Sequence, residues 1–565
     1  MALFSDDKSC SLPRFVDVDD MHPSSKRAVV HDLGLTTMTE IQAKTFEVAS
    51  SGRDILARAR TGTGKTLAFL LPAIETLLKQ KDFEPGKDIG VLILSPTREL
   101  AMQIHEQARS ILFRHGSNMN SNFMYGGTSK KEEVARLCKR MPTVLVATPG
   151  RLIDHLQTTA IHGVPFAKKL KQTRVLVLDE TDRLLDMGFK KDIDRILSYL
   201  SPKRQTLLFS ATIPPGVRSV LQDCLHPSYV TIDCIHDFDP ATHTNALVDQ
   251  RCVVHPQSMQ IDAPAQILRN IMDSDPNHKI MAFFPTANLT SYYSQIFNFH
   301  LSRPVIEIHS RKSQAYRSSA CNRFREKKTG ITMFTSDVSA RGMDFSGVSH
   351  VVQVGMPDSR ETYIHRLGRT GRAGNDGKGL LILSDVERGF LSNDLKDLDI
   401  VEDGTMLTDG PSCNDNMKSL RRTVGEDKNK SLAKAASKAY ASMLGYYASK
   451  LKALGIRDKN KLVGFVNDFS AAAGLADPPS ITPKVAESIG LRGIAGINIS
   501  SKSRGNNRQK SARGEYGKSG NRSGRGSNQG RRRWQRDGNP NEESSGGEIA
   551  DGERTYDGWG GAKKW

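Results

Sequence analysis

The chain has 565 residues, a formal net charge of +18 and a hydrophobic content of 38%. This length exceeds what one ordinary hydrophobic core can organise, and it predicts roughly two to four domains. No apolar run approaches the roughly 20 residues that a membrane-spanning helix needs, so we expect no membrane association. The basic balance favours a polyanionic partner.

The cysteines and the first residues bear on the compartment. The seven cysteines are widely spread and form no C-x-x-C pair, which favours reduced thiols and argues against a zinc site. Residues 1–10 contain early acids and no apolar segment, unlike a secretory signal or an Arg-rich transit peptide. We therefore expect an intracellular reducing compartment: the nucleus, the cytoplasm or, if the N-terminus is incomplete, an organelle.

Short apolar runs alternate with helical stretches from about residue 50 to residue 385. Uninterrupted apolar runs predict strands buried on both faces, as in a parallel sheet covered by helices. The first series comprises residues 54–57, 91–94, 143–147, 174–178 and 206–209, and the second comprises 280–284, 305–308, 331–334, 351–354 and 380–383. Two series predict two tandem α/β lobes, with a connector at residues 235–244.

The strand signal fades beyond residue 390. An apolar stripe at helical spacing predicts a helix over residues 431–454 that ends at Gly455, followed by helices at 461–474 and 482–490. From residue 501 the Gly, Ser, Asn and Arg bias leaves too little apolar surface to offset the entropy of ordering. We therefore expect a disordered tail, strongly basic because residues 501–540 hold twelve Lys or Arg against two acids.

The strongest chemical signal is the segment ARTGTGKT at residues 59–66, between an expected strand and an apolar helix start. Gly62 and Gly64 allow backbone N–H groups to face phosphate oxygens at a helix N-terminus. Lys65 would neutralise the β and γ phosphates of a nucleotide, and Thr66 would offer its hydroxyl to Mg²⁺. The alternative is a Gly-rich turn without function, which the flanking elements disfavour.

Two adjacent acids, Asp179 and Glu180, follow the apolar run at residues 174–178. At a strand end, Asp179 can hold Mg²⁺ through water, and Glu180 can orient or deprotonate an attacking water. Adjacent carboxylates also occur on solvated surfaces, but the preceding strand favours a functional pair.

Arginines form the third component, in the segment HRLGRTGR at residues 365–372. Guanidinium groups match phosphate oxygens in bidentate geometry, so this glycine-punctuated set predicts a phosphate clamp rather than a solvated basic loop. The segment lies in the second expected lobe. ATP should therefore be held between two lobes, and only the closed enzyme should be competent.

These blocks, in this order, resemble the DEAD-box branch of superfamily 2 helicases over about residues 35–375. Further matching segments lie at residues 96–101, 126–127, 148–151, 210–212, 314–317 and 335–344. The resemblance implies two RecA-like lobes and an RNA-dependent ATPase that locally unwinds RNA duplexes and remodels RNA or RNA–protein complexes by ATP-driven lobe closure. It implies ATP and Mg²⁺ as cofactors and RNA as partner, and we expect a monomer.

The resemblance also implies roles for individual residues. The ATP site would comprise Gln42, which reads the adenine edge, together with Thr61, Gly62, Thr63, Gly64, Lys65, Thr66 and Asp344, which touches the ribose. The metal would be held by Thr66 and Asp179. The catalytic set would be Lys65, Asp179, Glu180, His365 and the arginine fingers Arg369 and Arg372.

The RNA sugar-phosphate backbone would be held by Thr97, Arg98, Gly127, Thr148, Arg151, Arg317 and Thr335. Such contacts give little sequence specificity. Asp182, Ser210 and Thr212 would couple hydrolysis to lobe closure, and His365 would help to couple ATP to RNA.

Three positions depart from the family pattern. Thr181 replaces the alanine of the acidic tetrad, and we expect hydrolysis to survive while coupling slows. Met38 stands where proline is usual, which should loosen the loop before Thr39. Phe15 lies somewhat farther upstream of Gly34 than the family's aromatic residue.

The expected organisation is an N-terminal segment (1–34), an ATP-binding lobe (35–235), a second lobe (246–390), a helical extension (391–500) and the Arg/Gly/Ser-rich tail (501–565). The extension resembles, more faintly, that of organellar DEAD-box proteins that assist intron folding. Its aromatic residues can stack on a ligand or pack as a small core: Tyr446, Tyr447, Phe465 and Phe469. The tail is typical of an RNA tether, with a solubilising tail as the alternative.

Two other functions stay open. A non-catalytic RNA-binding scaffold is disfavoured by the intact lysine, acids and arginines. A DNA-directed helicase of the same superfamily is disfavoured by the glutamine motif and by the PTRELA segment at residues 96–101.

Overall fold

The structure is a computed structural model, and it describes residues 12–60, 62–213, 215–235, 248–337, 345–372, 376–407, 411–426 and 428–500. Of the predicted features, Thr61, Asp344, nearly all of the connector and the tail from residue 501 lie outside these residues. No helix in the described ranges is both long and apolar enough to cross a membrane.

The first sheet has seven parallel strands in the order β3-β4-β2-β7-β8-β1-β9. Their bounds are β1 Ile55–Arg58, β2 Val91–Leu94, β3 Ser121–Met124, β4 Val144–Ala147, β7 Val175–Leu178, β8 Gln205–Ser210 and β9 Val230–Asp233. A short antiparallel pair, β5 Ala160–Ile161 and β6 Val164–Pro165, lies outside this sheet. The five predicted strands are confirmed, and they occupy the interior of the sheet.

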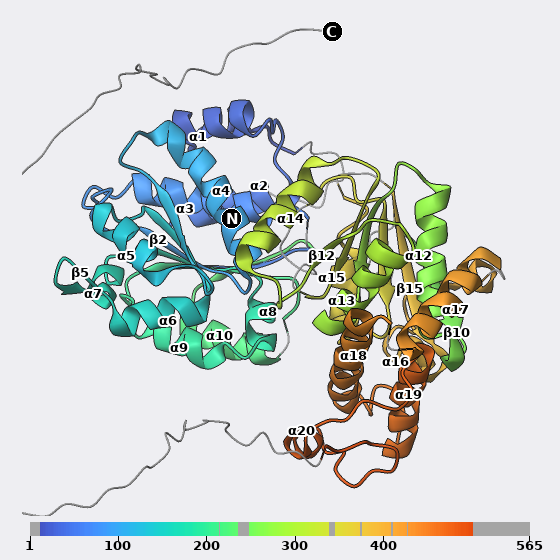
Figure 1. The fold of residues 1–565 in the computed structure, drawn as a ribbon. Coiled ribbons are helices and arrows are strands. Elements are labelled where there is room, and N and C mark those ends of the chain that lie inside the picture. The colour runs from blue at the N-terminus through green and yellow to red at the C-terminus, as the bar shows by residue number, and fades with distance from the viewer. Residues whose placement is uncertain are drawn as a thin grey trace, which may run out of the picture. The chain divides into compact units, whose positions relative to one another are not determined.

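Helices cover both faces of the first sheet (Figure 1). They are α2 Glu40–Ser50, α3 Lys65–Leu78, α4 Arg98–Leu112, α5 Lys130–Lys139, α6 Pro149–Thr158, α7 Phe166–Leu170, α8 Thr181–Asp186, α9 Lys190–Leu197 and α10 Pro215–Cys224. Strand β7 shows why an unbroken apolar run is needed: Val175 and Val177 enter one hydrophobic core, whereas Leu176 and Leu178 enter the other.

The N-terminal residues belong to the first of these cores. The elements η1 Phe15–Asp17, α1 Pro23–Arg27 and η2 Ala28–Asp32 precede α2, and Phe15 and Val29 are fully buried in the core beneath α3. The Phe15 N–H donates to the carbonyl oxygen of Thr36 at 3.0 Å. This segment is therefore anchored to the first lobe.

The second sheet also has seven parallel strands, in the order β12-β13-β11-β14-β15-β10-β16. Their bounds are β10 Val248–His255, β11 Lys279–Phe283, β12 Ile306–Ile308, β13 Ile331–Thr335, β14 His350–Val354, β15 Gly377–Ser384 and β16 Val401–Glu402. Its helices are α12 Asp262–Ser274, α13 Ala287–Gln295, α14 Gln314–Glu326, α15 Arg360–Leu367 and α16 Arg388–Asp394. The expected pair of parallel-sheet lobes is confirmed.

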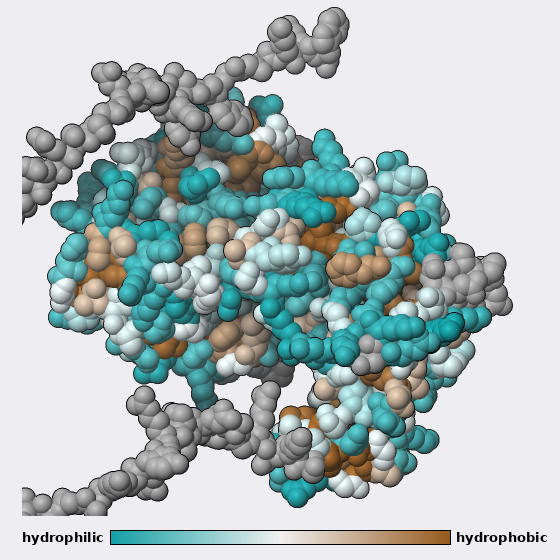
Figure 2. All heavy atoms as spheres, in the orientation of Figure 1, coloured by the Kyte–Doolittle hydropathy of each residue, from teal (hydrophilic) through white to brown (hydrophobic). Residues whose placement is uncertain are grey.

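The extension is helical and shares one continuous hydrophobic core with the second lobe. Its helices are α17 Pro411–Gly425, α18 Lys430–Ala448, α19 Lys459–Ala472 and α20 Pro483–Ser488. The prediction that the long helix runs to residue 454 was wrong. Helix α18 ends at Ala448, and Gly455, with φ of 66°, closes a separate turn after it. Figure 2 shows hydrophobic residues gathered near the tip around α20, where Val485 is partly exposed.

Candidate active site

The phosphate-binding segment lies between the end of β1 and the start of α3. Gly62 and Gly64 have φ of 83° and 90°, a left-handed conformation that side chains other than glycine rarely adopt. Lys65 begins α3, and its Nζ donates to the carbonyl oxygen of Ala59 at 2.9 Å. The ammonium is thus folded back over the loop, where a phosphate oxygen could take over the role of that carbonyl.

Gln42 contacts this loop directly. Its Oε1 accepts from the Thr39 N–H at 2.9 Å, and its Nε2 donates to the carbonyl oxygen of Gly64 at 3.1 Å. A Cβ added to Gly64 would lie only 2.4 Å from that Nε2, so the contact requires glycine there. Both ends of the Gln42 amide are engaged by protein, and the residue links the glutamine motif to the phosphate loop.

The expectation that Met38 loosens this loop stays a prediction, although Met38 itself is anchored in the structure. The Met38 N–H donates to the carbonyl oxygen of Pro13 at 2.9 Å, and its side chain is buried in the core. A proline has no N–H and could not form this hydrogen bond. Phe15 does not line the cavity described below, because its ring is fully buried beneath the loop.

The acidic pair lies at the carboxyl end of β7. The Asp179 N–H donates to the carbonyl oxygen of Leu94 on the neighbouring strand at 3.0 Å, and Glu180 adopts a left-handed φ of 49° before α8 begins. Burial, and secondly the neighbouring Glu180, raises the pKa of the Asp179 carboxyl, while Lys65 opposes this rise. A bound cation would favour the ionised carboxylate at such a site.

A cavity of about 370 Å³ is lined by residues of both lobes. The predicted residues that line it are Gln42, Gly62, Gly64, Lys65, Thr66, Asp179, Glu180, Arg369 and Arg372. Thr63 is not among them, and its hydroxyl donates to the carbonyl oxygen of Arg60 at 2.9 Å. The cavity falls within the size range of small-molecule and cofactor sites.

Several lining residues were missed in the sequence. They are Leu33, Leu35, Thr37 and Thr39 before α2, Leu67 on α3, and Leu100, Gln103 and Gln107 on α4. The spacing of the three α4 residues, i, i+3 and i+7, places them on one helix face, which is the signal that could have found them.

The arginines of the second lobe reach the phosphate loop. A Cβ added to Gly62 would lie 3.2 Å from Arg372 Nε, which itself donates to the carbonyl oxygen of Gly368 at 2.8 Å. Arg369 is buried, and its Nε donates to the carbonyl oxygen of His365 at 3.3 Å. Both guanidinium groups are thus positioned by the backbone at the end of α15.

Arg366, which the sequence analysis did not assign, anchors the same helix. It is fully buried, its Nε donates to Asp337 Oδ1 at 2.8 Å, and its guanidinium lies 5.4 Å from the centre of the Phe283 ring. The ion pair ties α15 to the segment that follows β13.

The predicted coupling residues form one hydrogen-bonded cluster. The Asp182 N–H donates to Ser210 Oγ at 3.3 Å, and Thr212 Oγ1 donates to Asp182 Oδ2 at 3.0 Å. His365 Nε2 of the second lobe lies 3.7 Å from the same Asp182 oxygen. The Thr181 hydroxyl is buried and donates to the carbonyl oxygens of Leu178 and Phe209 at 3.3 and 3.2 Å, which ties β7 to β8.

Five of the residues predicted to hold RNA lie in the first lobe: Thr97, Arg98, Gly127, Thr148 and Arg151. A Cβ added to Gly127 would lie 2.5 Å from Arg98 Nη1, so this guanidinium rests against the glycine pair. Burial, followed by the nearby charges of Arg317 and Arg151, lowers the pKa of Arg98. Thr97 and Thr148 occupy the N-cap positions of α4 and α6.

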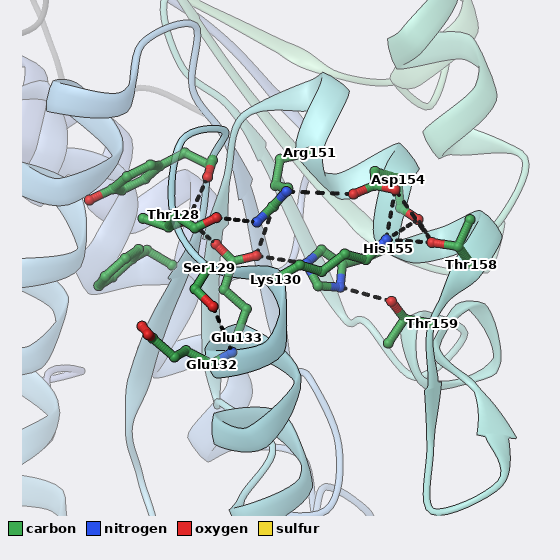
Figure 3. Close-up of polar contacts among 12 residues, drawn as sticks. Thr128, Ser129, Lys130, Glu132, Glu133, Arg151, Asp154, His155, Thr158 and Thr159 are labelled. Atoms are coloured by element: carbon green, nitrogen blue, oxygen red, sulfur yellow. Dashed lines mark hydrogen bonds and ion pairs between the residues drawn. The ribbon is translucent and has the colours of Figure 1, made fainter. Parts of the chain in front are cut away.

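Arg151 is held by a buried network centred on Glu133 (Figure 3). Glu133 Oε2 accepts from Arg151 Nε at 2.8 Å and lies 2.7 Å from His155 Nε2. Arg151 Nη2 also donates to the carbonyl oxygen of Thr128 at 2.7 Å. Glu133 was missed in the sequence because nothing near it distinguishes this buried glutamate from its exposed neighbour Glu132.

Two other predicted RNA ligands are already engaged. Arg317 Nη1 lies 2.9 Å from Glu99 Oε1, so this buried ion pair joins the second lobe to the first. Thr335 is fully buried, and its hydroxyl donates to the carbonyl oxygen of Ser336 at 2.9 Å. The Thr335 side chain is therefore engaged within the protein, and its contact with RNA stays a prediction.

Replacing Glu133 with glutamine should lower the free energy of unfolding by about 2 kcal/mol, because the half-buried Arg151 loses the closer of its two carboxylate partners and keeps only Asp154 at 3.6 Å. Urea unfolding followed by circular dichroism measures this. Glu132→Gln, an exposed change on the same helix, is the control. Equal stability of the two variants would contradict the structural role of Glu133.

The comparisons with known proteins agree with this arrangement. Residues 39–220 match the family described as DEAD/DEAH box helicase, and residues 263–374 match the helicase conserved C-terminal domain. DEAD-box ATP-dependent RNA helicase 26 of Oryza sativa subsp. japonica is 40% identical over 475 residues, which cover 84% of this chain and 84% of that protein. DEAD-box ATP-dependent RNA helicase 31 of Arabidopsis thaliana is 41% identical over 480 residues, covering 84% of this chain and 64% of that protein.

A solved structure is also similar. Mss116p bound to ssRNA and AMP-PNP superposes with a TM-score of 0.73 at 26% sequence identity, covering 87% of this chain and 98% of that chain. The similarity thus extends over both lobes and most of the extension. With two nucleotide-facing lobes and relatives at 40% identity, this chain belongs to the DEAD-box ATP-dependent RNA helicases.

Proposed function

We propose that this chain hydrolyses ATP in an RNA-dependent manner and uses the closure of its two lobes to open short RNA duplexes. The observation that carries the proposal is the shared cavity, in which Lys65, Asp179 and Glu180 of the first lobe face Arg369 and Arg372 of the second. Groups from both lobes are needed around one phosphate chain, so catalysis requires both lobes at once.

The residues present fit ATP and Mg²⁺. Thr66 and Asp179 line the same cavity, and hydroxyl and carboxylate oxygens are the ligands that Mg²⁺ prefers. When bound, Mg²⁺ would neutralise charge that develops on the phosphate oxygens. Lys65 would hold the β and γ phosphates, and Glu180 would orient the attacking water and accept its proton.

Two kinds of observation support RNA as the partner. The rice relative is named an RNA helicase, and the Mss116p structure is bound to ssRNA and AMP-PNP. In this chain, Arg98, Arg151 and the N-cap threonines offer charge and hydrogen bonds suited to a phosphate backbone rather than to base edges. Recognition should therefore be largely independent of sequence.

Lobe closure would be coupled to the ATP site through the cluster of Asp182, Ser210 and Thr212. His365 contacts Asp182 across the lobes, so the position of the second lobe bears directly on helix α8, which follows the acidic pair. ATP and RNA would stabilise the same closed arrangement, and hydrolysis would release it.

The remaining assignments are proposals of the same kind. We place the ribose contact at Asp344 and a further loop contact at Thr61, both outside the described residues. We also propose a monomer in an intracellular reducing compartment, acting on RNA or RNA–protein complexes, with the basic tail from residue 501 as an RNA tether.

ATP turnover measured with RNA, with DNA and with neither tests the proposal. Turnover that is stimulated by RNA and not by DNA supports it. Equal stimulation by DNA would favour a DNA-directed helicase, and absence of turnover under all three conditions would favour a non-catalytic scaffold.

A further inference from the structure

The loop that leads into the arginine-bearing helix is held by side chains of the extension. It comprises residues 355–359, between the end of β14 and the start of α15. Gly355 has φ of 74°, and a Cβ added there would lie 3.0 Å from Pro285 Cγ and 3.1 Å from Tyr447 Oη. Ser359 then caps α15, because its Oγ accepts from the Thr362 N–H at 3.2 Å.

Helix α18 of the extension and the turn that follows it supply three of these contacts. Tyr446 Oη donates to the carbonyl oxygen of Met356 at 2.8 Å, and Lys450 Nζ donates to the carbonyl oxygen of Asp358 at 2.8 Å. Lys450 Nζ also lies 2.6 Å from Asp358 Oδ1, with 19% of the Lys450 side chain exposed. Two consecutive turns of the extension thus hold two backbone carbonyls of the loop.

The third contact acts through a buried carboxylate. Tyr447 Oη donates to Glu387 Oε1 at 2.6 Å, and the same oxygen accepts from the Met356 N–H at 2.6 Å. Glu387 is itself fixed by the Ser384 N–H, which donates to its other oxygen at 3.0 Å. Both peptide groups that flank Met356 are therefore held, one from Tyr446 and one from Tyr447 through Glu387.

The position of this loop determines where α15 begins. Helix α15 has eight residues and carries His365 and Arg366, and it leads directly to the backbone that positions Arg369 and Arg372. A short rigid helix transmits a displacement at its first residue to its last. Small misplacements of catalytic groups lower rates strongly.

We propose that the C-terminal end of α18 and the turn after it form a positioning element for the arginine fingers, acting through Tyr446, Tyr447 and Lys450 on residues 356–358. The inference rests on the proposed function, because it assigns a task to the extension within that ATP site. It predicts that the extension sets the rate of ATP hydrolysis at saturating substrates and leaves the affinity for RNA unchanged.

The alternative is that these side chains only hold the extension together. Tyr440 provides a matched control for this. It lies on the same helix, is fully buried, and its hydroxyl donates to Asn467 Oδ1 at 2.8 Å within the extension rather than to the loop. Tyr440→Phe therefore removes a hydroxyl of similar burial without touching residues 355–359.

The experiment compares the full-length Tyr446→Phe/Tyr447→Phe variant with Tyr440→Phe and with the unaltered chain. RNA-stimulated phosphate release gives kcat and the half-saturating concentrations of ATP and RNA. We expect kcat of the double variant to fall about tenfold, the size that losing two net hydrogen bonds can produce. Both half-saturating concentrations should stay within about twofold of those of the unaltered chain, and Tyr440→Phe should retain its kcat.

A second pair of variants covers the case in which the tyrosine variant melts at a lower temperature than Tyr440→Phe. Lys450→Met removes the contact with Asp358 at a partly exposed position, and Lys452→Met is its exposed neighbour. We expect kcat of Lys450→Met to fall about threefold and that of Lys452→Met to stay unchanged, as expected for one lost hydrogen bond.

Equal kcat values within both pairs overturn the inference. An increase in the half-saturating RNA concentration at constant kcat also overturns it, because the extension would then act on RNA. If the unaltered chain shows no RNA-stimulated turnover, the proposed function itself fails, which is distinct from variants that match an active parent.

Discussion

Replacing Arg369 with alanine should lower RNA-stimulated ATP turnover by about a thousandfold, the lower end of the effect expected of an arginine finger. Arg369 is buried at the end of α15 and lines the cavity opposite Lys65 and Glu180. Its charge would stabilise the phosphoryl oxygens in the transition state more than in the bound ground state. We therefore expect the loss mainly in kcat rather than in the KM for ATP.

Steady-state phosphate release at saturating RNA, over a range of ATP concentrations, measures this. Arg388→Ala removes an exposed arginine on α16, paired with Glu402 and absent from the cavity lining, and serves as the control. A loss of kcat below about tenfold for Arg369→Ala would remove this arginine from the catalytic set.

Replacing Lys65 with alanine should lower turnover by about 100- to 1,000-fold. Lys65 contributes both to holding the phosphates and to neutralising charge during transfer, so we expect a higher KM for ATP as well as a lower kcat. This pattern differs from that of Arg369→Ala, where kcat alone carries most of the loss.

The same helix offers the control for Lys65. Lys79 caps the far end of α3, and its Nζ donates to the carbonyl oxygen of Ser50 at 3.3 Å, outside the cavity. Lys79→Ala should therefore turn over ATP like the unaltered chain. If Lys65→Ala bound ATP with an unchanged Kd in a direct nucleotide-binding assay, the phosphate loop would not bind ATP as described.

In the first sheet the interior strands could be predicted from the sequence, but the two edge strands could not. Interior strands such as β2 and β7 send apolar side chains to both faces, which produces an uninterrupted apolar run. Edge strands such as β3 and β9 are only partly buried and tolerate polar residues, so their sequences lack that run. The prediction therefore gave the first lobe without its outer strands. In the second lobe it gave the edge strand β12 but missed β16 and the interior strand β10, whose buried and exposed residues alternate over its first half and so form no unbroken apolar run.

Some residues of the site could be predicted from local sequence, whereas others could not. Residues whose function depends on a local backbone shape, such as Gly62, Lys65 and Asp179, stand in short recognisable segments. Glu133 and Arg366 depend on contacts across 18 and 29 positions of the chain, to Arg151 and Asp337 respectively, and local sequence does not reveal such pairs. Tertiary contacts alone decide which polar residues are buried.

The structure distinguishes between the two predicted roles of the aromatic residues in the extension. Aromatic side chains at helical spacing can stack on a ligand or fill a core. Tyr447, Phe465 and Phe469 are buried, and Phe469 packs edge-on against Tyr292 of α13 with ring centres 5.6 Å apart. These residues therefore join the extension to the second lobe, and Tyr446 completes the junction through its hydroxyl.

The central claim is that one nucleotide is held by both lobes at once, so that nucleotide and RNA stabilise the same closed state. The direct measurement is the affinity for a fluorescent single-stranded RNA with and without AMP-PNP and Mg²⁺, by anisotropy. We predict that AMP-PNP tightens RNA binding by at least about tenfold, and that Arg369→Ala abolishes this gain. Equal RNA affinity with and without AMP-PNP in the unaltered chain would contradict the claim.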